Sequence, residues 1–143
     1  MVQRICHGEE MMALIIRADY EAEGIEFFTP GEFSQQVAYM NRPRDYVIPP
    51  HVHNPVTRSV AYTKEVLFIR SGRLRVDFYT DDQTYLHSTV LNAGDVIFLA
   101  TGGHGFEMLE DTQIIEVKQG PYAGDDDKTR FSPVPPEQVR MLD

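Results

Sequence analysis

Two histidines, His51 and His53, are separated by one residue in the segment PPHVHNP, and prolines stand on both sides of them. On an extended chain, residues i and i+2 face the same way with Cα atoms about 6.5–7 Å apart. Both imidazoles can then approach one metal ion at metal–nitrogen distances of about 2.0–2.2 Å. The prolines restrict the backbone and remove hydrogen-bond donors, so the pattern predicts a preorganised ligand pair at a sheet margin. Taken alone, the motif leaves an exposed loop without a ligand role as the alternative.

Two histidines hold a metal poorly, and Glu65 and His104 are the candidates to complete the set. Glu65 opens the run EVLFIR, in which alternation places its carboxylate on the same face as the interior apolar residues. A carboxylate there costs on the order of several kcal/mol unless it is paired or bound. Lys64 is adjacent and points the other way, so the cation must come from elsewhere. His104 follows a Gly-Gly turn and starts a strand on its apolar face.

The elements that must position these residues are short strands. Runs rich in β-branched and aromatic residues, separated by turn residues, indicate strands at 11–20, 24–29, 36–41, 45–48, 65–70, 73–80, 85–91, 95–100, 105–110 and 112–119. One short helix is expected at 29–36, where Thr29 is a candidate cap, followed by Pro30 and Glu32. Short strands with almost no helical period predict an all-β sandwich or barrel.

The chain of 143 residues suits a single domain, 1–143. We expect a core barrel at about 36–118, N-terminal strands and the short helix at 1–35, and a C-terminal arm at 119–143. The arm is acidic and then proline-rich, which excludes a central strand. Its expected anchors on the barrel are Tyr122, Phe131, Val134, Met141 and Leu142. A wholly disordered tail is the competing interpretation.

The order of these residues resembles the two sequence motifs of the cupin superfamily. The first motif is carried by HVH at 51–53 and by Glu65 followed six residues later by Gly72; the second is carried by Gly94 and a strand near His104. The resemblance covers roughly residues 36–118.

This chain departs from the cupin pattern at several points. Asp45 stands where the first motif begins with glycine, and eleven residues separate His53 from Glu65, which makes a longer loop. In the second motif, position 100 is alanine instead of proline, position 108 is methionine instead of asparagine, and His104 comes one residue early. The first motif is therefore the more specific match.

The resemblance implies a double-stranded β-helix, or jelly-roll, barrel. It also implies that His51, His53, Glu65 and His104 together bind one divalent metal ion, for which Fe, Mn, Ni and Zn are the candidates. The chain looks most similar to small cupins that accompany bacterial surface-polysaccharide pathways. The expected function is to act on a small oxygenated metabolite or carbohydrate through this ion, with oxygenation, isomerisation and decarboxylation all open.

Two alternatives use the same fold differently. One is a non-catalytic sugar- or metabolite-binding cupin in which the metal is only a clamp. The other resembles metal-free sugar-nucleotide epimerases and isomerases, in which His51 or His53 would act as a base. His7 and His87 are interpreted as a terminal residue and an ordinary strand residue.

Four further residues are candidates to contact the substrate. Arg75 and Arg58 can hold an anionic group by a bidentate guanidinium contact. Tyr46 and Tyr62 flank the first motif and can orient a substrate, although packing in the core is the plainer interpretation for each.

The composition and net charge limit the classes of partner and the cellular location that we expect for this chain. A net charge of −9 argues against nucleic acid. The absence of a long apolar run argues against a membrane span, and without a signal-peptide pattern we expect a cytoplasmic protein. The single cysteine, Cys6, allows no intrachain disulfide. Exposed sheet edges and the apolar run MMALII predict a homodimer, with exchange of the N-terminal strand as one form.

Overall fold

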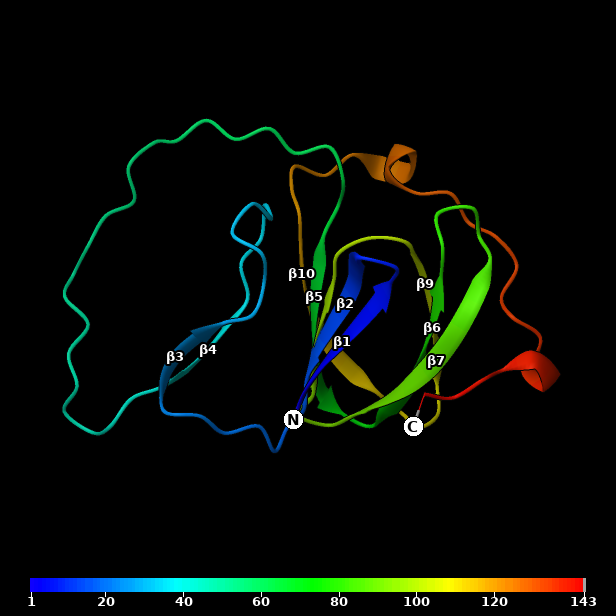
Figure 1. Cartoon of the computed structure of the whole chain (residues 1–143), viewed down its shortest axis with the longest axis horizontal. Helices are drawn as coiled ribbons and strands as arrows, with labels where there is room; N and C mark the ends of the chain where they lie inside the picture. Colours follow the sequence, from blue (N-terminus) through cyan, green and yellow to red (C-terminus); the bar gives the residue numbers. More distant parts are fainter. Residues whose placement is uncertain (143) are drawn as a thin grey trace. The chain divides into compact units, whose positions relative to one another are not determined.

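The computed structural model describes residues 1–142 as an all-β chain whose strands form three antiparallel sheets (Figure 1). The chain divides into two compact units. The first unit comprises Met1–Tyr20 and Thr63–Asp143, and the second comprises Glu21–Tyr62. The all-β class predicted from the sequence is confirmed.

The first unit contains a five-stranded sheet and a three-stranded sheet. The five-stranded sheet has the order β1-β2-β8-β5-β10, with bounds Val2–His7, Glu10–Ile16, Val96–Leu99, Glu65–Ser71 and Gln113–Lys118. The three-stranded sheet has the order β7-β6-β9, with bounds Tyr85–Asn92, Arg73–Tyr79 and Gly103–Met108. Strand β1 lies in a stretch that the sequence patterns did not predict as a strand.

One apolar core joins the two sheets of the first unit. Alternate residues of each strand point into it, as the period of two requires. The five-stranded sheet contributes Ile5, Ala13, Ile15, Leu67, Ile69, Ile97 and Leu99, and the three-stranded sheet contributes Leu74, Val76, Phe78 and Leu91. Within the described residues these are two open sheets and not one closed barrel, so the jelly-roll topology stays a prediction.

Glycines make the tight turns that bring the strands together. Gly72 joins β5 to β6 with φ +81°, and a Cβ there would lie 2.3 Å from the backbone oxygen of Asp111. Gly102 precedes β9 with φ +72°, and a Cβ there would lie 2.7 Å from the carbonyl oxygen of Tyr79. Both positions combine a left-handed backbone with a close approach that excludes a side chain.

The C-terminal segment lies against the three-stranded sheet. The backbone N–H of Val134 donates to the Tyr79 hydroxyl at 2.9 Å, and the Phe131 ring meets the Tyr79 ring edge-on with centroids 5.0 Å apart. Near the end of the chain, Met141 forms a parallel bridge with Ser88 of β7. Tyr122, which the sequence suggested as a further anchor, is exposed.

The second unit contains the hairpin of β3 (Gly24–Phe27) and β4 (Ala38–Asn41). The helix predicted at 29–36 is wrong, because this stretch forms turns. The Thr29 hydroxyl accepts the Val37 N–H at 3.0 Å, and the Gln36 amide donates to the carbonyl oxygens of Pro30 and Phe33, each at 2.9 Å. These side chains close a loop between two paired strands, which competes with helical hydrogen bonds.

Residues 42–64 contain no helix or strand, so the strand predicted at 45–48 is also wrong. Four prolines in this stretch lack the N–H groups that a ladder needs.

Candidate functional site

Glu65 is the first residue of β5, where the register places it between Leu99 of β8 and Lys118 of β10. Its side chain is only 12% exposed. One carboxylate oxygen, Oε2, lies 3.2 Å from Nε2 of His104, and the other, Oε1, lies 3.2 Å from Nζ of Lys118. The sequence predicted that Glu65 needs a cation from elsewhere in the chain. Lys118 supplies this cation, and His104 is a second partner.

These contacts fix the charge of Glu65. The hydrogen bond to His104, together with its charge, and the ammonium group of Lys118 lower the pKa of Glu65 from 4.5 to about 2, against the opposing effect of burial. The Glu65 carboxylate is consequently ionised at neutral pH. It can accept hydrogen bonds or bind a cation, but it cannot donate a proton.

Lys118 extends the cluster to the C-terminal segment. Its Nζ lies 3.3 Å from Oδ2 of Asp127, and Asp127 also accepts a hydrogen bond from the Thr63 hydroxyl. The hydrogen bond to Glu65 raises the pKa of Lys118. The sequence analysis missed Lys118, although the alternation in the run IIEVK places it on the inward side of β10.

His51 and His53 lie in the second unit. Their rings are neighbours, with centroids 5.2 Å apart and planes at 77°. Nδ1 of His51 lies 3.1 Å from the carbonyl oxygen of Pro49, which orients that ring and leaves its Nε2 as the atom available to a ligand. Both side chains are exposed.

The four predicted ligands are thus arranged as two pairs, each within one unit. Glu65 contacts His104 in the first unit, and the rings of His51 and His53 meet edge-on in the second. Over residues 1–142, no group of three or more His, Cys, Asp or Glu side chains is gathered as a complete metal site would require. The four-ligand set therefore stays a prediction.

Arg75, a predicted substrate contact, is held by two carboxylates of its own sheet. Its Nε and NH2 atoms donate to the two oxygens of Asp77 at 2.7 and 3.0 Å, and NH1 lies 2.7 Å from Glu107. These contacts, that with Asp77 foremost, raise the pKa of Arg75. A substrate anion would have to displace Glu107 to use this guanidinium.

Asp77 anchors a buried polar network that the sequence analysis did not single out. Its side chain is 4% exposed and accepts the Ser88 hydroxyl at 2.5 Å in addition to Arg75. The Ser88 oxygen lies 2.7 Å from the hydroxyl of Tyr85, which also accepts the Arg140 N–H at 2.9 Å. The network ties the three-stranded sheet to the end of the chain, so its first role is structural.

The remaining predicted substrate contacts, Arg58, Tyr46 and Tyr62, all lie in the second unit and are exposed. Arg58 NH1 donates to the carbonyl oxygen of Val56 at 3.4 Å, and the Arg42 guanidinium stands over the Tyr46 ring at 4.6 Å from its centroid. Neither tyrosine packs in the core, which was the simpler interpretation of the sequence.

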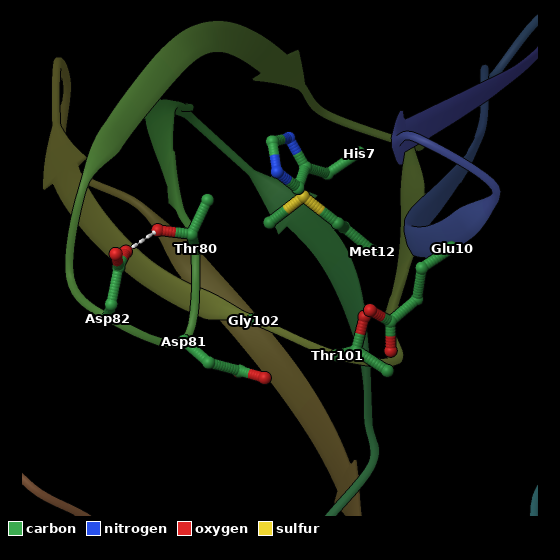
Figure 2. Close-up of a pocket in the computed structure, with 8 residues that line it drawn as sticks. All are labelled: His7, Glu10, Met12, Thr80, Asp81, Asp82, Thr101 and Gly102. Carbon is green, nitrogen blue, oxygen red and sulfur yellow. Dashed lines mark hydrogen bonds between the residues drawn. The ribbon is translucent and has the colours of Figure 1, made fainter.

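A separate pocket of about 330 Å³ lies in the first unit (Figure 2). It is lined by His7, Glu10, Met12, Thr80, Asp81, Asp82, Thr101 and Gly102. The hydrogen bond that Figure 2 marks, from the Thr80 hydroxyl to Asp82, lowers the pKa of that carboxyl. The lining includes none of the predicted metal ligands or substrate contacts.

Along residues 1–142, no helix combines the length and the apolar character that a membrane crossing would need. In comparisons with known proteins, no protein-family model, curated protein or solved structure matches this chain.

Proposed function

We propose that this chain is a metal-binding protein of the jelly-roll (cupin) type. In this proposal His51, His53, Glu65 and His104 hold one divalent metal ion, and the ion binds a small oxygenated metabolite or a carbohydrate. The observation that supports the proposal most is the contact between Glu65 and His104, because residues from two different sheets place a carboxylate oxygen and an imidazole nitrogen side by side.

The distance between the Glu65 and His104 donor atoms suits a shared ion. Neighbouring ligands of an octahedral ion with bonds of about 2.1 Å are about 3 Å apart, and the Glu65 and His104 donor atoms are 3.2 Å apart. The proposal adds that the two pairs bind the same ion.

Within the site, the residues of the chain have separate tasks. The Glu65 carboxylate, ionised at neutral pH, supplies negative charge, and Lys118 orients it through Oε1. Three imidazoles and one carboxylate would leave about two positions open on an octahedral ion. A bound divalent ion would act there as a Lewis acid toward an oxygen ligand.

A second candidate is a metal-free protein of the same fold, and the Lys118–Glu65 ion pair favours it. In this case the ammonium group at 3.2 Å already supplies the positive charge that Glu65 requires. The cluster would then bind a polar metabolite directly through hydrogen bonds and charge.

Metal titration of untagged, chelator-stripped protein separates the two candidates. We expect binding of one equivalent of Zn²⁺, Ni²⁺ or Mn²⁺ by calorimetry. His51→Ala and His104→Ala should each weaken it at least about tenfold. His7→Ala is the matched control, since His7 is exposed and lies outside the predicted ligand set. Lys118→Met should tighten binding, because it removes a cation that competes for Glu65.

Two results would overturn the metal proposal. One is an untagged protein that retains and binds no divalent ion. The other is a set of ligand variants that bind metal as tightly as the His7→Ala control. The first result would favour the metal-free candidate.

A further inference from the structure

The end of the described chain pairs with β7, the outer strand of the three-stranded sheet. Ser88 of β7 forms a parallel bridge with Met141. The Ser88 N–H donates to the carbonyl oxygen of Arg140, and the Leu142 N–H donates to the carbonyl oxygen of Ser88, both at 2.8 Å. We call residues 139–142 the terminal segment. A pairing this short belongs to the least stable parts of a fold, so a small change in free energy can release it.

His87 lies beside Ser88 and points to the opposite face of β7. It is the register partner of Phe78 on β6, and the two rings meet edge-on with centroids 5.5 Å apart. Nδ1 of His87 is buried and has no hydrogen-bond partner in the part of the chain that the structure describes. In a neutral imidazole one nitrogen carries no proton, and Nδ1 can be that atom. A proton there would create a buried N–H without an acceptor, which costs free energy.

The terminal segment places a second cation close to His87. Arg140 and Leu142 flank Met141, which shares the face of Ser88, so both point to the face of His87. Leu142 packs against the core there. Burial, and after it the charge of Arg140, lower the pKa of His87, whereas a contact with its own backbone acts in the opposite direction. His87 and the terminal segment therefore fit together only while His87 is neutral.

The other charged groups around His87 are bound to partners of their own. On β6, Asp77 points to the opposite face of the sheet and accepts hydrogen bonds from Arg75. From the five-stranded sheet, Arg17 approaches this side of β7 and pairs with Asp95 at 2.9 Å. Among the described residues, no carboxylate forms an ion pair with His87. A protonated His87 would consequently face the Arg140 cation without a compensating negative charge.

We propose that the terminal segment is a pH-sensitive strap, which stays on β7 at neutral pH and leaves it when His87 takes up a proton. Release removes the Arg140 cation and opens the edge of β7 to water, so the charged imidazole is better solvated after release. Release also frees the Tyr85 hydroxyl, which accepts the Arg140 N–H at 2.9 Å. This inference does not depend on the metal-binding proposal, because His87 is not one of the predicted ligands.

The release equilibrium should depend on pH because His87 binds a proton more weakly while the terminal segment is paired. Its pKa is lowered in the paired state, and after release it approaches the ordinary value of 6.5. The paired state is therefore fully favoured above pH 6.5 and loses stability as the pH falls through that value. At a pH of about 5.5, protonation can favour release by at most about tenfold.

Amide hydrogen exchange at a pH of about 7.5 and of about 5.5, corrected for the intrinsic pH dependence of exchange, tests the strap in a buffer that contains a chelator. We expect the protection of the Ser88 and Leu142 amides to fall at least about threefold at the lower pH, while the amides of β6 keep theirs. His87→Phe keeps an aromatic ring against Phe78 and cannot take up a proton. In this variant the protection should change less than about 1.5-fold.

His7→Phe is the matched control, since it makes the same substitution at an exposed histidine of β1, and it should respond to pH like the unchanged protein. Arg140→Gln provides a second test that does not require the His87 variant to fold. Removing this cation should raise the pKa of His87, measured by an NMR titration of its ring protons, and should reduce the response of the terminal segment to pH.

Three results would overturn the proposal. The first is protection of the Leu142 amide that does not change with pH in the unchanged protein, or that falls equally in the His87→Phe variant. The second is a parallel loss of protection in β6, which would show unfolding of the whole unit instead of release of the terminal segment. The third is a His87 titration that the Arg140→Gln substitution leaves unchanged.

Discussion

Replacing Glu65 with glutamine tests whether the cluster of Glu65, His104 and Lys118 stabilises the first unit. The substitution keeps the size of the side chain and removes its negative charge. The neutral amide cannot attract the Lys118 ammonium group from 3.2 Å as a carboxylate does. The variant therefore isolates the electrostatic contribution of the cluster.

The magnitude follows from the pKa of Glu65. One pKa unit corresponds to about 1.4 kcal/mol, so a fall from 4.5 to about 2 sets a ceiling of roughly 3 kcal/mol. Solvent reaches the cluster, since the side chains of His104 and Lys118 are both 28% exposed. Screening reduces the effect, and we expect the variant to lose roughly 2 kcal/mol of unfolding free energy at pH 7.

The lowered pKa of Glu65 determines how the stability difference between the two proteins changes with pH. Glu65 has a lower pKa in the folded chain than in the unfolded chain, so its stabilisation is complete above the unfolded value of about 4.5. As the pH falls toward about 2, protonation of the carboxyl removes it. The difference in stability between the two proteins should therefore shrink across this acid range.

Urea unfolding followed by far-ultraviolet circular dichroism, with a chelator present, measures this difference at each pH. Glu107→Gln is the matched control: Glu107 also pairs with a cation, Arg75 at 2.7 Å, but its side chain is 57% exposed. A surface pair of this kind contributes on the order of 0.5 kcal/mol. Equal losses for the two variants, or a Glu65→Gln loss that persists unchanged to the lowest pH, would refute the reasoning.

Two further predictions concern the three-stranded sheet. Asp77→Asn should lower the unfolding free energy by about 2 kcal/mol, because it leaves the Nε and NH2 groups of Arg75 without their charged acceptor, while NH1 keeps its contact with Glu107. Urea unfolding measures this, and a loss below about 1 kcal/mol would contradict it. Tyr79→Phe should cost about 1 kcal/mol by removing the hydroxyl that accepts the Val134 N–H. It should also speed proteolysis of the C-terminal segment, followed by mass spectrometry; an unchanged cleavage rate would argue against this anchor.

The strands of the first unit were predictable from the sequence because local pattern and packing agree there. The run 73–79 alternates strictly, and β6 occupies those residues. The strands β8 and β10 likewise fall within the predicted runs, and β5 and β7 each extend one residue beyond theirs, into turns such as the one at Gly72. Strand β1 was not predicted, because Gln3, Arg4 and Cys6 interrupt the apolar pattern of this stretch. Its pairing with β2 makes it a strand.

The helix and the strand that were wrongly predicted both lie in the second unit, where the local sequence pattern and the tertiary contacts favour different structures. Thr29, Pro30 and Glu32 have the types and spacing of a helix start, but the side chain of Gln36 folds back onto the carbonyl oxygens of this stretch. The tertiary loop outweighs the weak propensity of so short a helix. The strand predicted at 45–48 has suitable residues and no partner strand in the structure.

For the candidate site, alternation predicted the positions of Glu65 and His104, whose side chains meet on the inner side of the first unit. It could not predict Lys118 as the partner, because the identity of a cross-strand neighbour depends on register, and register is a property of the folded sheet. A carboxylate at an inward position shows that a cation is needed. Which cation meets that need is decided by the neighbouring strand.

The two oxygens of Glu65 are not equivalent, and this constrains how the residue can bind a metal ion. Lys118 holds Oε1, whereas Oε2 faces His104. A divalent ion shared by Glu65 and His104 would therefore bind through Oε2 alone, with the ammonium group retained on the other oxygen. In the proposed metal site this arrangement would lower the net charge that the carboxylate offers, so Lys118 would weaken metal binding. Metal affinity should accordingly depend on Lys118 even though it donates no electron pair to the ion, which is why the Lys118→Met variant is informative.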